Sequence, residues 1–337
     1  MKKRTMTMLV TVAIMATACE KNEDKTPRGD VQAVFSANIG NPLVAGETAT
    51  TPTGRATGST WDEQDAIGIY ASESTNKDEQ NWKYTRVPGK TGAEAWTSER
   101  PFYFKDTEAD AEVITFWAYY PWTDKLQDIS IDSKTVTIIK VDASDKQTPE
   151  LQKTIDFMFA DKEAEDQPDH PAAPCTGNRD EPSVNFQFRH CMSKVVFKLA
   201  ASEADGVTND DIKAMTGLLT GVKSKGTFRL DNGTITDDDE AATDLSLTTV
   251  EETDGKITVS AIVVPQKRTE TTDARLALKK TVTNEVFKTQ KLLNFNLEAG
   301  KKYTYTITVK KLGLKITASD ITDWKAEEVG NEDAILQ

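Results

Sequence analysis

The stretch from residue 184 to residue 199, VNFQFRHCMSKVVFKL, decides the fold class. Apolar and polar residues alternate in 184–188, and the alternation resumes in 193–199. Successive side chains of a β-strand point to opposite faces of a sheet, so a period of two predicts two half-buried strands. We expect a second sheet of the protein to begin at Val184.

Further runs of β-branched and aromatic residues lie on both sides of this stretch. In 231–233 an Asn-Gly pair suits a tight hairpin turn, because both central positions of that turn take positive φ. The short amphipathic segment 210–219 is the helix candidate. Many short strands with turn residues between them predict an all-β protein of two antiparallel β-sandwiches. The other predicted strands are 31–39, 66–70, 113–120, 135–139, 155–159, 226–230, 257–264, 274–278, 286–293, 303–309 and 314–317.

The length of 337 residues predicts roughly two domains. A polar insertion rich in Asp, Glu, Pro and Ala occupies 161–182 and reads as a long loop near a domain boundary. We therefore expect an N-terminal β-sandwich domain over 31–182. A C-terminal β-sandwich domain would cover 183–337.

The first residues read as an export signal. Three basic residues at positions 2–4 precede a short apolar stretch, 8–15, which is well under the ~20 residues that span a bilayer. The small residues before Cys19 resemble the lipobox of bacterial lipoproteins, so we expect a signal peptide over 1–18 and lipid on Cys19. A plain secretory signal with an incidental cysteine is the alternative. The charged segment 19–30 would then be a solvated tether to the outer membrane.

The charge balance argues against nucleic acid as a partner. Asp and Glu number 54 against 41 Lys and Arg, giving a formal net charge of -13. Phosphate binding needs clustered cations, and none stand out along the chain. We expect no nucleic-acid partner.

Residue sets for catalysis or cofactor binding do not stand out either. His170 lies in the acidic loop, and His190 follows a strand, where a half-buried structural histidine is the simpler interpretation. A carboxylate pair such as Glu163 and Asp166 is expected by chance on so acidic a chain. No glycine-rich phosphate loop or zinc spacing is present. We expect no enzyme and no cofactor.

Three other motifs allow more than one interpretation. The run 237–240, Asp-Asp-Asp-Glu, is either a solvated turn or a weak calcium site, although it lacks the glycine and spacing of a calcium loop. The tripeptide 28–30, Arg-Gly-Asp, matches an integrin-type motif that also occurs by chance. Cys175 and Cys191 either pair in an oxidising compartment or stay as buried thiols.

An ordered set of segments covers nearly the whole mature chain and resembles the fimbrillin family of the Bacteroidales, particularly its Mfa1-like and fimbrillin-like lipoprotein members, the type V pilus subunits. The resemblance implies two transthyretin-like antiparallel β-sandwich domains in tandem. It also implies export as a lipoprotein to the cell surface and polymerisation after an Arg-specific protease removes the first strand. The segments are GRATGSTW (54–61), DAIGIY (65–70), FWAYYPW (116–122), DFMFA (156–160), FRHCMSK (188–194), AGKKYTYTITV (299–309) and ITDW (321–324).

The resemblance can be carried over to particular positions. A cut after Arg55, or alternatively after Arg28, would release the lipid, and the cut at Arg55 would also detach the first strand and open a groove that another chain could fill. The tail after Trp324 is short and charged, so tip and anchor roles stay open beside a shaft role. The removable strand would carry Val31, Ala33, Phe35, Ala37 and Ile39 inward, and the donor strand would carry Tyr303, Tyr305, Ile307, Val309, Leu314 and Ile316.

A binding module is the alternative to a fimbrial subunit. A monomeric surface lipoprotein could capture a glycan or a host protein with exposed aromatic side chains, for which Trp82, Trp96 and Trp122 are the candidates. The same tryptophans could instead pack in the core.

Overall fold

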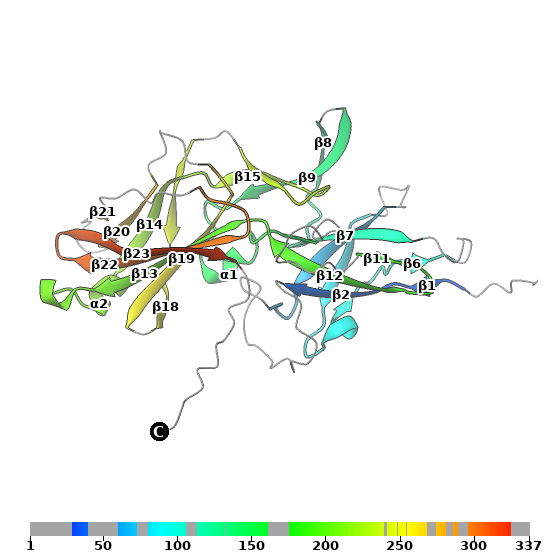
Figure 1. Ribbon diagram of the computed structural model, residues 1–337, viewed down its shortest axis with the longest axis horizontal. Helices are drawn as coiled ribbons and strands as arrows, with labels where there is room; N and C mark the ends of the chain where they lie inside the picture. Colours follow the sequence, from blue (N-terminus) through cyan, green and yellow to red (C-terminus); the bar gives the residue numbers. More distant parts are fainter. Residues whose placement is uncertain are drawn as a thin grey trace, which may run out of the picture.

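The computed structural model describes residues 29–39, 60–72, 80–105, 113–131, 133–160, 175–238, 241–247, 249–253, 255–267, 274–280, 286–288 and 296–324. Strands dominate these residues, which confirms the all-β prediction. Figure 1 shows two lobes side by side, with the first strands in one lobe and the last strands in the other.

The N-terminal lobe is built on one large sheet. Aromatic and aliphatic side chains from nearly all of its strands meet in one buried core. The short strands β1 (Val31–Gln32) and β6 (Tyr103–Phe104) form a separate pair, and β11 (Thr176–Gly177) pairs with β7. The strand order is β2 (Val34–Ile39), β12 (Ser183–His190), β10 (Met158–Ala160), β7 (Ile114–Tyr120), β3 (Ala66–Ala71), β4 (Trp82–Arg86) and β5 (Trp96–Thr97).

The C-terminal lobe is a sandwich of two sheets. Phe197 and Ile307 from one sheet and Leu276 from the other are fully buried in the core between them. The first sheet has the order β18 (Thr249–Thr253), β19 (Lys256–Val263), β13 (Ser193–Ala201), β22 (Lys301–Lys310) and β23 (Gly313–Asp323). The second has the order β17 (Thr243–Leu247), β14 (Met215–Val222), β20 (Arg275–Lys280) and β21 (Val286–Lys288).

A further sheet joins the two halves of the sequence. It has the order β16 (Ile235–Asp237), β15 (Lys225–Arg229), β9 (Lys134–Asp142) and β8 (Gln127–Ile131). Phe228 of β15 packs in one core with Phe159 of β10 and with Ile262 of β19, so this core touches the strands of both lobes. We call this sheet the joining sheet.

The helices within the described ranges are few and short. They are α1 (Pro149–Gln152), α2 (Asn209–Lys213) and the 3-10 turns η2 (Gly92–Ala95) and η4 (Glu203–Asp205). The predicted helix over 210–219 is wrong beyond α2, because β14 begins at Met215 and pairs with β17 and β20. A helix long and apolar enough to cross a membrane does not occur in the described part of the chain.

Two sequence predictions about the sheets are corrected. Val184 does not begin a second sheet, since β12 pairs with β2 and β10, and the change of sheet falls between His190 and Ser193. Pairing is also not purely antiparallel: β2 runs parallel to β12, and β13 runs parallel to β22. The division into two domains at residue 182 stays a prediction.

The hairpin predicted around 231–233 exists with a different turn. Phe228 pairs with Ile235 across β15 and β16, and residues 230–234 connect the two strands. Gly233 has a φ of 68°, while Asn232 is not among the residues of positive φ, so the turn is longer than the two-residue type.

Candidate functional site: the first strand and its groove

Strand β2 lies at the edge of the large N-terminal sheet. Among the described strands its one neighbour in that sheet is β12, and the ladder runs from Val34 opposite Ser183 to Ile39 opposite Phe188. A strand at a sheet edge can leave without breaking any other pair of strands. Removal of β2 would therefore break one ladder of the large sheet, and removal of the whole predicted strand 31–39 would also break the separate β1–β6 pair.

The side chains of this strand alternate as the sequence predicts. Ala33, Phe35, Ala37 and Ile39 are buried in the N-terminal core, whereas Asn38 is exposed. Val31 is half-buried and belongs to the separate strand β1. The alternation means that one face of the segment fills a groove in the lobe.

Phe35 is the largest side chain that fills this groove. Its ring lies 4.9 Å from that of Tyr84, 5.3 Å from that of Phe116 and 5.6 Å from that of Phe186, measured between centroids. These partners come from β4, β7 and β12, so the slot crosses the sheet. Aromatic pairs at such distances are stabilising beyond the area they bury.

Polar contacts fix the ends of the segment. The backbone N–H of Val34 donates to the carbonyl of Pro182 at 2.9 Å, and the indole Nε1 of Trp61 donates to the carbonyl of Ala37 at 2.8 Å. Arg179, which is buried, donates from Nη2 to the carbonyl of Gly29 at 2.6 Å. The groove thus recognises the backbone of the segment as well as its side chains.

Several predicted positions lie outside the described residues: Cys19, Arg28, Arg55, Glu163, Asp166 and His170. Of the Arg-Gly-Asp tripeptide, Gly29 and Asp30 are described, and Asp30 pairs with Lys105 at 2.8 Å.

The predicted donor residues lie in the C-terminal lobe. Tyr303, Tyr305, Ile307 and Val309 are buried on β22, which lies between β13 and β23. Leu314 and Ile316 lie on β23, the edge strand of the same sheet, where Leu314 is buried and Ile316 is half-buried. Of these two strands, β23 is therefore the one at an edge of the sheet as described, and β18 lies at the opposite edge.

The end of β23 is anchored to the junction between the lobes. The indole of Trp324 stacks on the imidazole of His190 with centroids 3.9 Å apart, and His190 Nδ1 lies 2.9 Å from a carboxylate oxygen of Asp156. All three side chains are buried. This agrees with the structural interpretation of His190, although no sequence pattern predicts its contact with Trp324.

Cys175 and Cys191 are both buried thiols that are not joined by a disulfide, so the disulfide alternative is wrong. Cys175 packs in the N-terminal core and Cys191 in the core beneath the joining sheet. Different cores hold the two thiols, and each behaves as a small apolar side chain.

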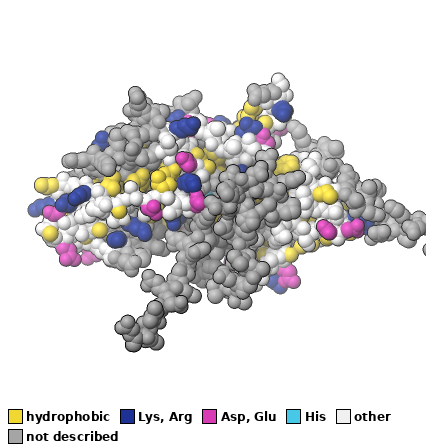
Figure 2. Space-filling model, in the orientation of Figure 1, with side chains coloured by type: hydrophobic (Ala, Val, Ile, Leu, Met, Phe, Trp, Pro, Cys, Tyr) yellow, Lys and Arg dark blue, Asp and Glu magenta, His cyan; other side chains and the backbone are white. Residues whose placement is uncertain are grey.

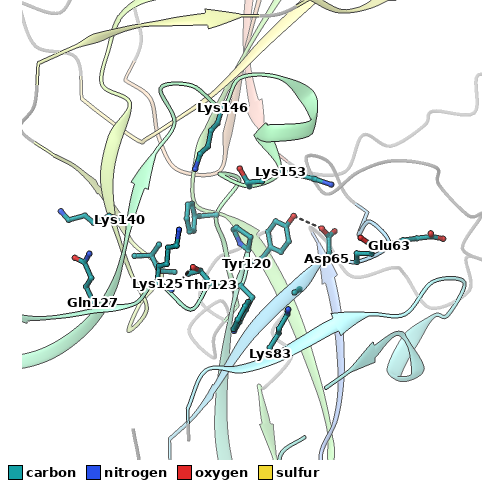
Figure 3. A pocket seen from close by; sticks show the side chains of 17 residues that line it. Glu63, Asp65, Lys83, Tyr120, Thr123, Lys125, Gln127, Lys140, Lys146 and Lys153 are labelled. Carbon is teal, nitrogen blue, oxygen red and sulfur yellow. Dashed lines mark hydrogen bonds between the residues drawn. The ribbon is translucent and has the colours of Figure 1, made fainter. Parts of the chain in front are cut away.

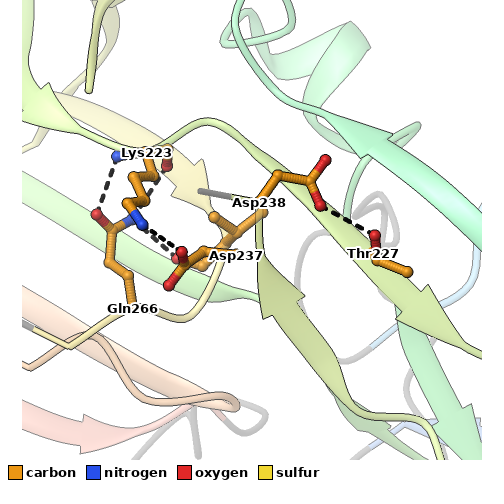
Figure 4. Close-up of polar contacts among 6 residues, drawn as sticks. Lys223, Thr227, Asp237, Asp238 and Gln266 are labelled. Atoms are coloured by element: carbon orange, nitrogen blue, oxygen red, sulfur yellow. Dashed lines mark hydrogen bonds and ion pairs between the residues drawn. The ribbon is translucent and has the colours of Figure 1, made fainter. Parts of the chain in front are cut away.

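The acidic run 237–240 is described at its first two residues. Asp237 pairs with Lys223, and Asp238 accepts a hydrogen bond from Thr227 at 3.0 Å (Figure 4). Lys140 of β9 also reaches Asp238 at 3.4 Å. These aspartates join neighbouring strands, and a cluster suited to a metal ion is absent from the residues that the structure describes.

The three candidate tryptophans differ in exposure. Trp82 and Trp96 are buried in the N-terminal core, which fits the packing interpretation. Trp122 is half-buried and lines a cavity of about 650 Å³ beside the joining sheet (Figure 3). The remaining polar and charged lining comes from Glu63, Gln64, Asp65, Lys83, Tyr120, Thr123, Lys125, Gln127, Lys140, Lys146, Lys153 and Thr154.

Asp65 is the buried carboxyl of this cavity. Burial raises its pKa from 3.8 to about 6, although the backbone N–H of Asp62 and the hydroxyl of Tyr120 both donate to the carboxylate and oppose the rise. Sequence reasoning missed this cavity, since its lining is scattered between residues 63 and 157.

Charge is otherwise mixed over the surface. Figure 2 shows Lys and Arg side chains interspersed with Asp and Glu over the visible face, and hydrophobic side chains gathered in a band over the C-terminal lobe.

Comparison with known proteins places the chain in a family. Residues 54–324 match the model of the family described as fimbrillin-like. A Bacteroides uniformis protein with the provisional name fimbrium subunit Fim1C is 27% identical over 347 residues, which cover 98% of each chain.

Two solved structures share the fold. Both are provisionally described as cell adhesion proteins, and both are 23% identical to this chain with a TM-score of 0.61. The one from Bacteroides uniformis aligns over 87% of this chain and 99% of its own, and the one from Bacteroides ovatus over 89% and 100%. The match of the family model over most of the sequence shows that this chain belongs to the fimbrillin-like family.

Proposed function

We propose that this protein is a subunit of a surface fimbria whose copies join by strand exchange. The observation that carries the proposal is the position of β2: an edge strand whose inward side chains fill a groove in the N-terminal core. Family membership and the provisional name of the Bacteroides uniformis relative support a fimbrial role.

Loss of the first strand would leave an unstable groove. The slot around Phe35 would expose rings of Tyr84, Phe116 and Phe186, and β12 would lose the partner of one edge. Burying a Phe or Ile side chain is worth roughly 1.5–3 kcal/mol, and unpaired strand edges attract another strand. A strand from a second copy would restore both the buried side chains in the groove and the backbone pairing at the edge of β12.

The groove and the β23 edge of the C-terminal sheet belong to different lobes. In Figure 1, β2 lies in one lobe and β23 in the other. A contact between two different surfaces of identical subunits can repeat from one subunit to the next. Unless the rotation between subunits closes a ring, this repetition builds a filament. The arrangement suits head-to-tail growth.

We further propose that the donor segment starts with Leu314 and Ile316. Because β23 is an edge strand, it can leave while β22 stays paired with β13. Release of Tyr303, Tyr305, Ile307 and Val309 would open the C-terminal core, in which all four are buried.

Export and maturation complete the proposal. The chain would reach the outer membrane with lipid on Cys19, and an Arg-specific protease would cut after Arg55, between β2 and Trp61. A cut there would detach β2 together with the lipid. A cut after Arg28 would release the lipid and leave the groove filled, because β2 follows that position.

The proposal is tested with purified chain from residue 20 onward, treated with an Arg-specific protease. We expect a new N-terminus at Ala56 by Edman sequencing and filaments by electron microscopy. R55A should block both results, and R28A should block neither. Strand exchange would be contradicted if the protease cut efficiently after Arg55 and the cut chain, like the uncut chain, stayed monomeric without forming filaments.

A further inference from the structure

The cavity that Trp122 lines has an unusual charge for this protein. Five lysines and only two carboxylates, Glu63 and Asp65, line it, although the whole chain carries a formal net charge of -13. A cavity lined by one sign of charge concentrates ions of the opposite sign. An anionic ligand fits this lining better than a neutral one or a cation.

The five lysines fall into two groups. Lys140 bonds to Thr227 and Asp238, and Lys153 pairs with Asp62 at 3.8 Å, so both already have partners in the protein. In Figure 3 their ammonium groups point away from the centre of the cavity.

The other three, Lys83, Lys125 and Lys146, point into the cavity in Figure 3. None of them forms an ion pair with a carboxylate within the part of the chain that the structure describes. Lys83 Nζ lies 4.6 Å from the ring centroid of Trp122. The ring leaves the ammonium charge of Lys83 uncompensated, and Lys146 interacts electrostatically with Asp142 without forming an ion pair, so these three cations can face a ligand.

The rest of the lining narrows the class of ligand. Thr123, Gln127 and Thr154 offer hydroxyl and amide groups, and Trp122 and Phe157 offer flat apolar surface. A volume of about 650 Å³ exceeds what a single ion needs and lies within the usual range for organic ligands. Carboxylates, hydroxyls and apolar ring faces occur together in acidic saccharides.

We propose that this cavity binds an acidic saccharide, with Lys83, Lys125 and Lys146 facing its carboxylate or sulfate groups. The site does not depend on strand exchange, because no residue of β2 lines the cavity. Its occupant would be a sugar chain that carries several negative charges.

The test is isothermal titration calorimetry on the uncut chain from residue 20 onward. Probes are oligogalacturonate, hyaluronan and chondroitin sulfate tetrasaccharides, with maltotetraose, tetraglutamate and sodium phosphate as comparisons. We expect at least one acidic tetrasaccharide to bind with Kd below about 1 mM and to weaken as salt rises. Maltotetraose should not bind measurably.

Variants separate the site from general charge. K125Q/K146Q should weaken binding of the same tetrasaccharide by at least about tenfold, and K125R/K146R should restore most of it. The control K134Q/K311Q removes the same charge at exposed lysines that do not line the cavity and should bind within about twofold of the parent chain.

Three results would overturn the proposal. The first is that none of the acidic tetrasaccharides binds. The second is that K125Q/K146Q and K134Q/K311Q weaken tetrasaccharide binding equally. Tetraglutamate or phosphate binding as tightly as the best tetrasaccharide would show a site for acidic peptides or for any small anion instead. Because the experiment uses uncut protein, none of these results bears on fimbrial assembly.

Discussion

The indole Nε1 of Trp61 donates a hydrogen bond of 2.8 Å to the carbonyl oxygen of Ala37. The two residues lie on opposite sides of Arg55, so the proposed cut would leave one partner in the subunit and let the other leave. Trp61 also packs on Trp96, Tyr120 and Phe188, with centroids 5.1 Å, 5.4 Å and 5.1 Å away. It is therefore the residue through which the retained lobe holds the end of the first strand.

Trp61→Phe should lower the free energy of unfolding of the uncut chain by about 1–3 kcal/mol, because the carbonyl of Ala37 loses its indole donor. Urea denaturation followed by circular dichroism measures this. Trp96→Phe removes the same ring volume from the partner indole and serves as the matched control. If both variants lost equal stability, the hydrogen bond would contribute nothing of its own.

Phe35→Ala should destabilise the uncut chain by about 3–5 kcal/mol, since it empties the slot between Tyr84, Phe116 and Phe186. The neighbouring Asn38→Ala changes an exposed residue of the same strand and should stay within about 0.5 kcal/mol. Thermal unfolding of both variants is the measurement. A Phe35→Ala variant as stable as Asn38→Ala would mean that the groove does not depend on this ring.

Asp65 should make stability depend on pH. Its pKa rises from 3.8 to about 6 on folding, so the folded chain holds the proton more tightly than the unfolded chain between these values. The free energy of unfolding therefore falls as pH rises from about 4 to about 6, by up to about 3 kcal/mol from this carboxyl. Asp65→Asn should flatten that part of the curve in urea titrations at pH 4, 5, 6 and 7, and an unchanged slope would contradict the assignment.

Trp324→Ala should cost about 3–5 kcal/mol, because the indole is buried against His190 where the two lobes meet. Ile321→Ala, on the same strand but 58% exposed, is the control and should cost less than about 1 kcal/mol. Differential scanning calorimetry would report the two shifts. Equal shifts would show that Trp324 does not anchor the strand.

Sequence reasoning predicted the strands better than their partners. The alternation in 31–39 predicted which side chains of the first strand are buried, because burial on one face follows from the period of two. The same alternation in 184–188 and 193–199 could not tell that one run pairs with β2 and the next with β19. Strand pairing depends on residues far away in sequence, and the pattern within one strand carries no information about them.

Tertiary pairing also explains the wrong helix prediction. Residues 215–219 follow a capping box of Thr208 and Asp211, a sound local signal that starts α2. The strand that follows is set by its neighbours β17 and β20, which outweigh local preference. The lysine-lined cavity was missed for a related reason: Lys83, Lys125 and Lys146 come from separate elements and have no common motif.

The joining sheet has a mechanical consequence. Its strands β9 and β15 come from opposite halves of the sequence and are hydrogen-bonded to each other from Ile138 opposite Arg229 to Asp142 opposite Lys225. If neighbours in a fibre hold the molecule at its two lobes, tension crosses this ladder and the packed rings of Phe159 and Phe228 beneath it. The load is then shared among many bonds at once, and the subunit would stretch as one body instead of parting at a linker.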